Sequence, residues 1–199
     1  MMIKVGITGG IGSGKTTVCK LFEKMDIPVY YADVEAKRLM NTDNVLKQQI
    51  KELLGKEAYY RNGRLNRKYV ASIVFSDKDK LEKLNGIVHP AVALDGKRWF
   101  EQQKSAYAIK EAALLVENES YKQLDFLIVV TAPVEMRIKR VVKRDNSDYN
   151  EVKRRIANQL PEIQKKKVAD FVIDNSGDVS LVSQVWKIHR KLIEMGDDY

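Results

Sequence analysis

Apolar positions along the chain follow two patterns: short continuous runs, and longer stretches with an apolar residue every three or four positions. The short runs indicate buried strands, and they predict strands at 3–8, 28–31, 107–110, 126–131 and 171–174. The longer stretches indicate amphipathic helices, and they predict helices at 16–25, 34–40, 148–159 and 178–195, with one more opened by Pro133. This alternation predicts an α/β protein with a parallel sheet covered by helices on both faces.

The segment from residue 44 to residue 105 interrupts this alternation. It has no strand pattern, and helical periods predict helices at 45–54, 67–75, 77–88 and 91–103. The dipeptide Asn62-Gly63 indicates a turn between the first two of these helices. We therefore expect an all-helical insertion in the α/β core.

Composition and charge limit the classes of protein that remain. The chain has 199 residues, of which 44% are apolar and 31% charged, as is typical of globular proteins. The single cysteine, Cys19, cannot form an intramolecular disulfide, and no stretch resembles a signal peptide or a membrane span. We therefore expect a cytoplasmic protein. The net charge of +8 leaves two kinds of partner open, nucleic acid or small polyanions.

A glycine-rich stretch follows the first predicted strand. Residues 9–16 fit the pattern G-x-x-x-x-G-K-[ST] of a phosphate-binding loop. Its glycines permit the backbone angles at which several N–H groups point at one phosphate, and the helix that follows adds partial positive charge. Lys15 is predicted to reach the β- and γ-phosphates of a nucleotide, and the Thr16 hydroxyl to ligate Mg²⁺. The alternative is a glycine-rich turn that binds nothing.

The rest of the sequence narrows the class of phosphate-loop protein. The Asn-Lys-x-Asp motif expected of a GTPase is missing. Motor and transporter ATPases need an apolar strand that ends in an acidic residue, and the nearest candidate, Ile109-Lys110-Glu111, is a poor match. A small-molecule kinase is the better interpretation.

Two further features favour phosphoryl transfer, and each has a plainer alternative. Asp33 follows the second predicted strand, where ligands bind in open parallel sheets, so it could accept a proton from an attacking hydroxyl. Alternatively, Asp33 is the N-cap of the next helix. Arg137, Arg140 and Arg144 share one face of a predicted helix and suit the neutralisation of phosphoryl charge. Alternatively, they form a solvated basic face.

Several segments together form a more specific pattern. They are the stretch from Gly6 to Thr17, Tyr31-Ala32-Asp33-Val34-Glu35-Ala36, Gly63-Arg64-Leu65-Asn66-Arg67, Val74-Phe75, Leu81-Glu82, His89-Pro90, Leu114-Leu115-Val116-Glu117, Arg140-Val141-Val142-Lys143-Arg144-Asp145, Gln159, and 169–175. In these segments the chain resembles the dephospho-coenzyme A kinase family over nearly its whole length.

The resemblance implies transfer of the ATP γ-phosphate to the ribose 3′-hydroxyl of dephospho-coenzyme A, with Mg²⁺ brought by ATP. It also implies the phosphate-loop NTPase fold of nucleoside monophosphate kinases, with a five-stranded parallel sheet flanked by helices. The expected single domain spans 1–199, with a core at 1–41, 105–145 and 168–199, a helical substrate-binding insertion at about 42–104, and a lid at about 145–165.

Residue roles are carried over at the matching positions. The implied catalytic residues are Asp33 as general base, Lys15 and Arg140. The implied ATP contacts are Gly10, Gly12, Ser13, Gly14, Lys15, Thr16, Thr17, Arg140, Arg144 and Asn175. The implied acceptor contacts are Thr8, Asp33, His89, Leu115 and Glu117. For His89 the alternative is capping or packing at the start of a helix.

The chain departs from the family pattern at three positions. Tyr31 replaces an aspartate, which leaves Asp33 as the acid that follows the second strand. Asn66 replaces a second aspartate and removes a charge from the insertion, and Ala113 replaces a proline before Leu114.

Two rival functions remain at this stage. One is another small kinase that acts on a nucleotide such as AMP or UMP. The other is an ATP-switched nucleic-acid binder, against which the scattered lysines and arginines argue. We expect ATP and dephospho-coenzyme A as partners, no nucleic acid or membrane, and a monomer or weak homo-oligomer.

Overall fold

The computed structural model describes residues 2–197, which divide into two compact units. The core unit contains the residues before Tyr31 and after Glu101, and the helical unit is Tyr31–Glu101. Within the described residues no helix is both long enough and apolar enough to span a membrane.

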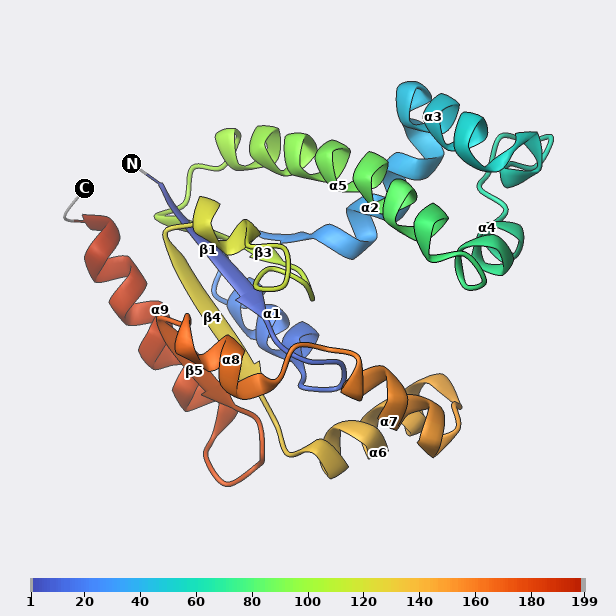
Figure 1. Ribbon diagram of the computed structural model, residues 1–199. Coiled ribbons are helices and arrows are strands. Elements are labelled where there is room, and N and C mark those ends of the chain that lie inside the picture. The colour runs from blue at the N-terminus through green and yellow to red at the C-terminus, as the bar shows by residue number, and fades with distance from the viewer. Residues whose placement is uncertain (1, 198–199) are drawn as a thin grey trace. The chain divides into compact units, whose positions relative to one another are not determined.

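The core unit is built on one five-stranded sheet (Figure 1). Its strands lie in the order β2-β3-β1-β4-β5, and β1 pairs in parallel with both β3 and β4, as β4 does with β5. The strands are β1 (Ile3–Thr8), β2 (Val29–Tyr31), β3 (Tyr107–Glu111), β4 (Phe126–Thr131) and β5 (Phe171–Asp174). The predicted parallel α/β fold is confirmed. Because the chain crosses from one side of β1 to the other, the carboxyl end of β1 lies at the switch point where such sheets bind ligands.

Both faces of the sheet are covered. On one face, Leu127 and Val129 of β4 pack with Leu115 from the turn after β3, and α8 (Glu162–Lys167) covers the same strand. The helix α1 (Lys15–Glu23) covers strands β1 and β3, and it packs beside α9 (Leu181–Asp197), which also contacts β3. Strands β1, β3 and β4 are buried along almost their whole length, which explains the continuous apolar runs in their sequences.

Two more helices connect β4 to α8, as Figure 1 shows. They are α6 (Val134–Asp145) and α7 (Tyr149–Ala157). Pro133 is the N-cap of α6, one position before the place predicted for it, and the Asp148 carboxylate caps α7 by accepting from the N–H groups of Asn150 and Glu151.

The helical unit contains no strand beyond the end of β2 among its described residues, as the sequence predicts. Its helices are α2 (Ala32–Thr42), α3 (Asn44–Leu54), α4 (Arg67–Val74) and α5 (Lys78–Glu101), with a 3-10 turn, η1 (Lys56–Ala58), after α3. Asn66 caps α4, because its side-chain oxygen accepts from the Tyr69 N–H at 3.2 Å. Asparagine serves as an N-cap as well as aspartate does, so this departure preserves the local fold.

Two local predictions in this unit are wrong. The helices predicted at 77–88 and 91–103 are one continuous helix, α5, with Pro90 inside it. Asp33 is not the N-cap of α2: the helix begins at Ala32 with Tyr31 as its N-cap, and Asp33 lies in the first turn.

Candidate active site

The glycine-rich stretch forms a tight turn between β1 and α1. Gly12 and Gly14 have positive φ angles of 78° and 99°, a region that glycine adopts without strain. Gly14 is the N-cap of α1, so the N-terminus of this helix, with its partial positive charge, adjoins the loop. The local geometry is that of a phosphate-binding loop.

The predicted loop residues lie together on this turn. The Lys15 ammonium folds back over the loop and donates to the carbonyl oxygens of Gly9 (2.9 Å) and Gly10 (3.4 Å). Thr16 and Thr17 are exposed in the first turn of α1. Ser13 is fully buried, and its hydroxyl has no hydrogen-bond partner among the described residues. An unpartnered buried hydroxyl in an anion-binding turn fits a bound ligand better than an empty loop.

The buried side chain of Arg137 packs against the loop and forms a hydrogen bond to it. It is 4% exposed, and its Nε donates to the Ile11 carbonyl at 2.9 Å. A Cβ on Gly10 would lie 2.0 Å from one of its terminal nitrogens, so the loop approaches the guanidinium as closely as glycine permits. Burial lowers the pKa of Arg137, and the nearby Glu162 carboxylate opposes that shift. A buried cation beside the loop attracts a polyanion.

Gln159 connects the same loop to the end of α7. Its side-chain oxygen accepts from the Ile11 N–H at 2.9 Å and from Arg137 at 3.2 Å. Apolar contacts reinforce this junction, because Ile11 packs with Val152 of α7 and Ile138 of α6. From the sequence, Arg137 was expected only to help neutralise phosphoryl charge together with Arg140 and Arg144, and Gln159 was a position of the family pattern with no role of its own. Their role depends on contacts between residues more than a hundred positions apart.

Arg140 and Asn175 also contact the loop. Arg140 donates to the Asn175 carbonyl at 3.0 Å and lies 3.5 Å from the Gly12 carbonyl oxygen. The Asn175 side-chain amide donates to the Ser13 carbonyl at 2.8 Å, and a Cβ on Gly14 would clash with it. Asn175 follows β5 directly, so the carboxyl edge of the sheet brings it to the loop.

Arg144, the third predicted arginine, does not reach the loop. Its guanidinium pairs with Asp145 at 2.6 Å, and its side chain is 62% exposed. This pair raises the pKa of Arg144 and lowers the pKa of Asp145.

The three acceptor contacts predicted in the core unit have different environments. Thr8 is buried, and its hydroxyl donates to the Ala113 carbonyl at 3.1 Å. Leu115 is buried in the cluster with Leu127 and Val129, so it has almost no surface to offer a ligand. Glu117 accepts from the Lys165 ammonium at 2.5 Å, and that lysine side chain is 1% exposed.

Two predicted residues belong to the helical unit. Asp33 is exposed in the first turn of α2, where the helix dipole favours a carboxylate. No hydrogen bond or ion pair occupies its carboxylate among the described residues, so it is available to a ligand. His89 is exposed in the middle of α5, which excludes the alternative of a cap at a helix start.

Glu111 is a buried acid that the sequence reasoning set aside. It ends β3, pairs in register with Ile7 of β1, and is 7% exposed. Its charge also raises the pKa of Cys19, although burial of that thiol is the larger cause. The sequence does show a strand that ends in an acid here. Lys110 interrupts its apolar run, however, so the segment matched that pattern poorly.

The residues that could hold a metal ion are oxygen donors at the loop. Between residues 2 and 197 no group of three or more His, Cys, Asp or Glu side chains is arranged to bind a metal. The exposed Thr16 hydroxyl next to the loop is a hard oxygen ligand, and such sites suit Mg²⁺ that keeps waters and phosphate oxygens as its other ligands.

Known proteins with similar sequences and a similar fold support this interpretation. Residues 3–180 match the family model described as dephospho-CoA kinase. Among curated relatives, the dephospho-CoA kinase of Bacteroides fragilis is 36% identical over 94% of this chain and 92% of its own, and that of Salinibacter ruber is 40% identical over 90% and 92%. The crystal structure of TT1252 from Thermus thermophilus superposes with a TM-score of 0.84 at 32% identity, over 96% of this chain and 97% of its own.

Proposed function

Because the chain belongs to the dephospho-CoA kinase family, whose members phosphorylate dephospho-coenzyme A in the final step of coenzyme A synthesis, we propose a division of labour within its fold. The loop after β1 holds the triphosphate of ATP. Asp33 activates the ribose 3′-hydroxyl of the acceptor, and the γ-phosphate moves to that oxygen to give coenzyme A and ADP.

The observation that carries this proposal is the construction of the loop. Gly12 and Gly14 take positive φ angles, α1 begins at Lys15, and the buried Arg137 supports the turn. Each feature adds positive potential or N–H donors at one point, as binding of a triphosphate requires.

Mg²⁺ accompanies ATP in this proposal. When bound, it neutralises charge on the β- and γ-phosphates. The Thr16 hydroxyl would be the protein's oxygen ligand to this Mg²⁺. The acid Glu111 ends β3, which is the strand next to β1.

The chemical step needs an acid–base group and a set of cations. Asp33 accepts the proton of the 3′-hydroxyl while the oxygen–phosphorus bond forms and the bond from the γ-phosphorus to ADP breaks. Lys15 releases the Gly9 and Gly10 carbonyls, and with Arg140 it offsets the charge on the equatorial oxygens. ADP leaves with the electron pair of the broken bond.

The segment at about 145–165 acts as a lid in this proposal. It contains α7, and Gln159 joins its end to the loop. Closure of a lid excludes water and limits hydrolysis of ATP. Arg144 exchanges Asp145 for a phosphate when the lid closes.

In this proposal the acceptor contacts are His89 in the helical unit and Thr8 and Glu117 in the core unit. Leu115, expected from the sequence as a further contact, is left out because its buried side chain has almost no surface to offer a ligand. The remaining boundaries stay as proposed, with a core at 1–41, 105–145 and 168–199 and an insertion at about 42–104. Two polyanionic substrates account for the net charge of +8 without nucleic acid. We propose a cytoplasmic monomer or weak homo-oligomer.

An acceptor screen tests this function. ADP release is followed with ATP, Mg²⁺ and either dephospho-coenzyme A, AMP or no acceptor. We expect turnover with dephospho-coenzyme A only. Turnover with AMP and none with dephospho-coenzyme A would replace the proposal with a nucleotide kinase.

A further inference from the structure

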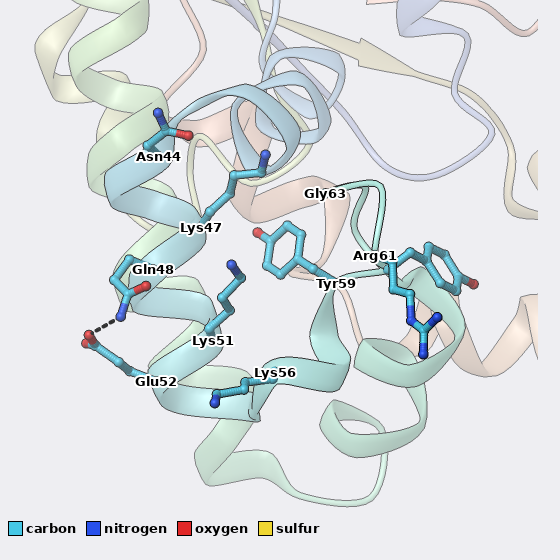
Figure 2. A pocket seen from close by; sticks show the side chains of 10 residues that line it. Asn44, Lys47, Gln48, Lys51, Glu52, Lys56, Tyr59, Arg61 and Gly63 are labelled. Carbon is cyan, nitrogen blue, oxygen red and sulfur yellow. Dashed lines mark hydrogen bonds between the residues drawn. The ribbon is translucent and has the colours of Figure 1, made fainter.

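A basic pocket lies in the helical unit, on a surface that carries none of the proposed catalytic residues. It has a volume of about 770 Å³. Figure 2 shows α3 along one side of it and the turn around Arg61 along the other. Its lining residues are Asn44, Lys47, Gln48, Lys51, Glu52, Lys56, Tyr59, Tyr60, Arg61 and Gly63.

The charge of this pocket is strongly positive. Lys47, Lys51, Lys56 and Arg61 contribute four cations against one carboxylate, Glu52. That carboxylate accepts a hydrogen bond from the Gln48 amide, drawn as a dashed line in Figure 2. Between residues 2 and 197 none of the four cations forms an ion pair with a carboxylate. The fold therefore gathers positive charge here without neutralising it.

Two of the lysines lie over the ring of a buried tyrosine, Tyr59. Lys47 and Lys51 are four residues apart on α3, so their like charges repel. Both ammonium groups lie over the Tyr59 ring, at 5.8 and 5.6 Å from its centre, which favours this arrangement through cation–π attraction. Tyr59 is 7% exposed, and its hydroxyl donates to the Met40 carbonyl at 2.8 Å. Burial raises the pKa of Tyr59 to about 12, so this donor stays protonated.

The opposite side of the pocket is also fixed by the backbone. Gly63 has a φ of 76°, which closes the turn at the predicted Asn62-Gly63 site. A Cβ on Gly63 would lie 3.6 Å from the Lys47 ammonium, so the turn approaches that lysine closely. The four cations therefore line one pocket, and the turn at Gly63 forms the part of its wall next to Lys47.

We propose that this pocket binds a diphosphate group. Its volume is in the range of small-molecule sites. Several cations around one space match a ligand with several negative oxygens, and the Arg61 guanidinium suits phosphate oxygens. The diphosphate could belong to the acceptor itself, in which case the inference rests on the proposed function, or to a free nucleotide.

Titration with inorganic pyrophosphate tests the site. The measurement is isothermal calorimetry on a Lys15→Ala background, which weakens binding at the phosphate loop. We expect the added pair Lys47→Ala and Lys51→Ala to weaken pyrophosphate binding at least tenfold at low salt. The matched control, Lys37→Ala and Lys68→Ala, removes two exposed lysines of the same unit outside the pocket and should leave the affinity unchanged.

Equal affinity in the pocket variant and the control would overturn the proposal. A thermal melt shows whether each variant folds, and Lys51→Arg, which keeps the charge, should retain binding. Loss of pyrophosphate binding in a folded variant supports the site.

Kinetics on the loop-intact protein then distinguish the two sources of the diphosphate. If the acceptor supplies it, the pocket variant has a higher KM for dephospho-coenzyme A and an unchanged KM for ATP. If a free nucleotide supplies it, both KM values stay unchanged while pyrophosphate binding is lost. If the wild-type protein does not phosphorylate dephospho-coenzyme A, the proposed function is wrong. The pyrophosphate titration would still decide whether the pocket binds a diphosphate.

Discussion

Three arginines that share one predicted helix face have three different environments. Arg137 is buried against the loop, Arg140 contacts the Asn175 carbonyl, and Arg144 pairs with Asp145 at the surface. The i, i+3, i+7 spacing correctly places them on one side of α6. It contains no information about which part of that side meets the loop, because the contact joins residues 126 positions apart in the sequence.

The role of Arg137 in supporting the loop can be tested by substitution. Arg137→Met keeps much of the side-chain volume but leaves the Ile11 carbonyl without its donor. We expect the free energy of unfolding to fall by about 1–3 kcal/mol and the affinity for ATP to fall about tenfold. Denaturant unfolding and nucleotide titration measure the two effects. Lys139→Met, an exposed position on the same helix, should change stability by less than about 0.5 kcal/mol. If Arg137→Met lowers the free energy of unfolding by no more than Lys139→Met does, Arg137 does not support the loop.

The role of Asp33 as general base predicts a specific kinetic defect. In Asp33→Asn the side chain keeps its shape but cannot take the hydroxyl proton, so kcat should fall about 10²–10⁴-fold, while ATP binds as before. Glu35→Gln removes another acid from the first turn of the same helix and is the matched control. Near-normal turnover in Asp33→Asn would leave that carboxylate as a favourable charge at a helix end and nothing more.

At the scale of elements, strand and helix positions were predictable where one period dominates. The strands at 3–8, 126–131 and 171–174 are observed as predicted. The break predicted at Pro90 is wrong because Leu84, Val88, Val92 and Phe100 form one buried stripe that continues across it. The six-residue α8 was missed because its sequence, EIQKKK, has no apolar period.

The helix α8 is anchored by the ion pair of Lys165 and Glu117. The lysine is 1% exposed, so Lys165→Met leaves the carboxylate without its partner and should destabilise the protein by up to about 3–5 kcal/mol. Lys122→Met breaks the exposed pair with Glu119 and should cost about 0–1 kcal/mol. Urea unfolding compares the two variants. Equal losses would mean that the buried pair contributes no more than the surface pair.

The attachment of α9 to the sheet predicts a pH dependence of stability. The Tyr107 hydroxyl lies 2.7 Å from His189 Nδ1, and burial lowers the pKa of His189 below its ordinary 6.5. The unfolded chain therefore binds the proton more readily. The contribution of this histidine is complete above about pH 6.5 and is lost as the pH falls through the lowered pKa.

Chemical unfolding of wild type and His189→Gln at pH 7 and pH 5 measures this contribution. We expect a steeper loss of stability on acidification in the wild type than in the variant. The same pH slope in both proteins would contradict the assignment.

At the scale of the whole molecule, the loop was predictable and its supports were not. A strand, a glycine turn and a helix start are consecutive in the sequence, so the pattern from Gly9 to Thr16 carries the local geometry. Its supporting contacts, from Arg137, Gln159 and Asn175, come from distant segments that the sheet order brings to one edge. The environment of Leu115 was equally hidden, because burial against β4 is a property of the assembled core.

The most direct test of the account is the identity of the phosphorylated atom. The protein is incubated with ATP, Mg²⁺ and dephospho-coenzyme A, and the product is analysed by ³¹P NMR alongside the ADP formed. With the wild-type protein we expect one new phosphomonoester, on the ribose 3′-oxygen, in an amount equal to that of ADP. With Lys15→Ala we expect neither product to form at a comparable rate. ADP formed without a phosphorylated acceptor, or a phosphate on another atom, would contradict the central claim.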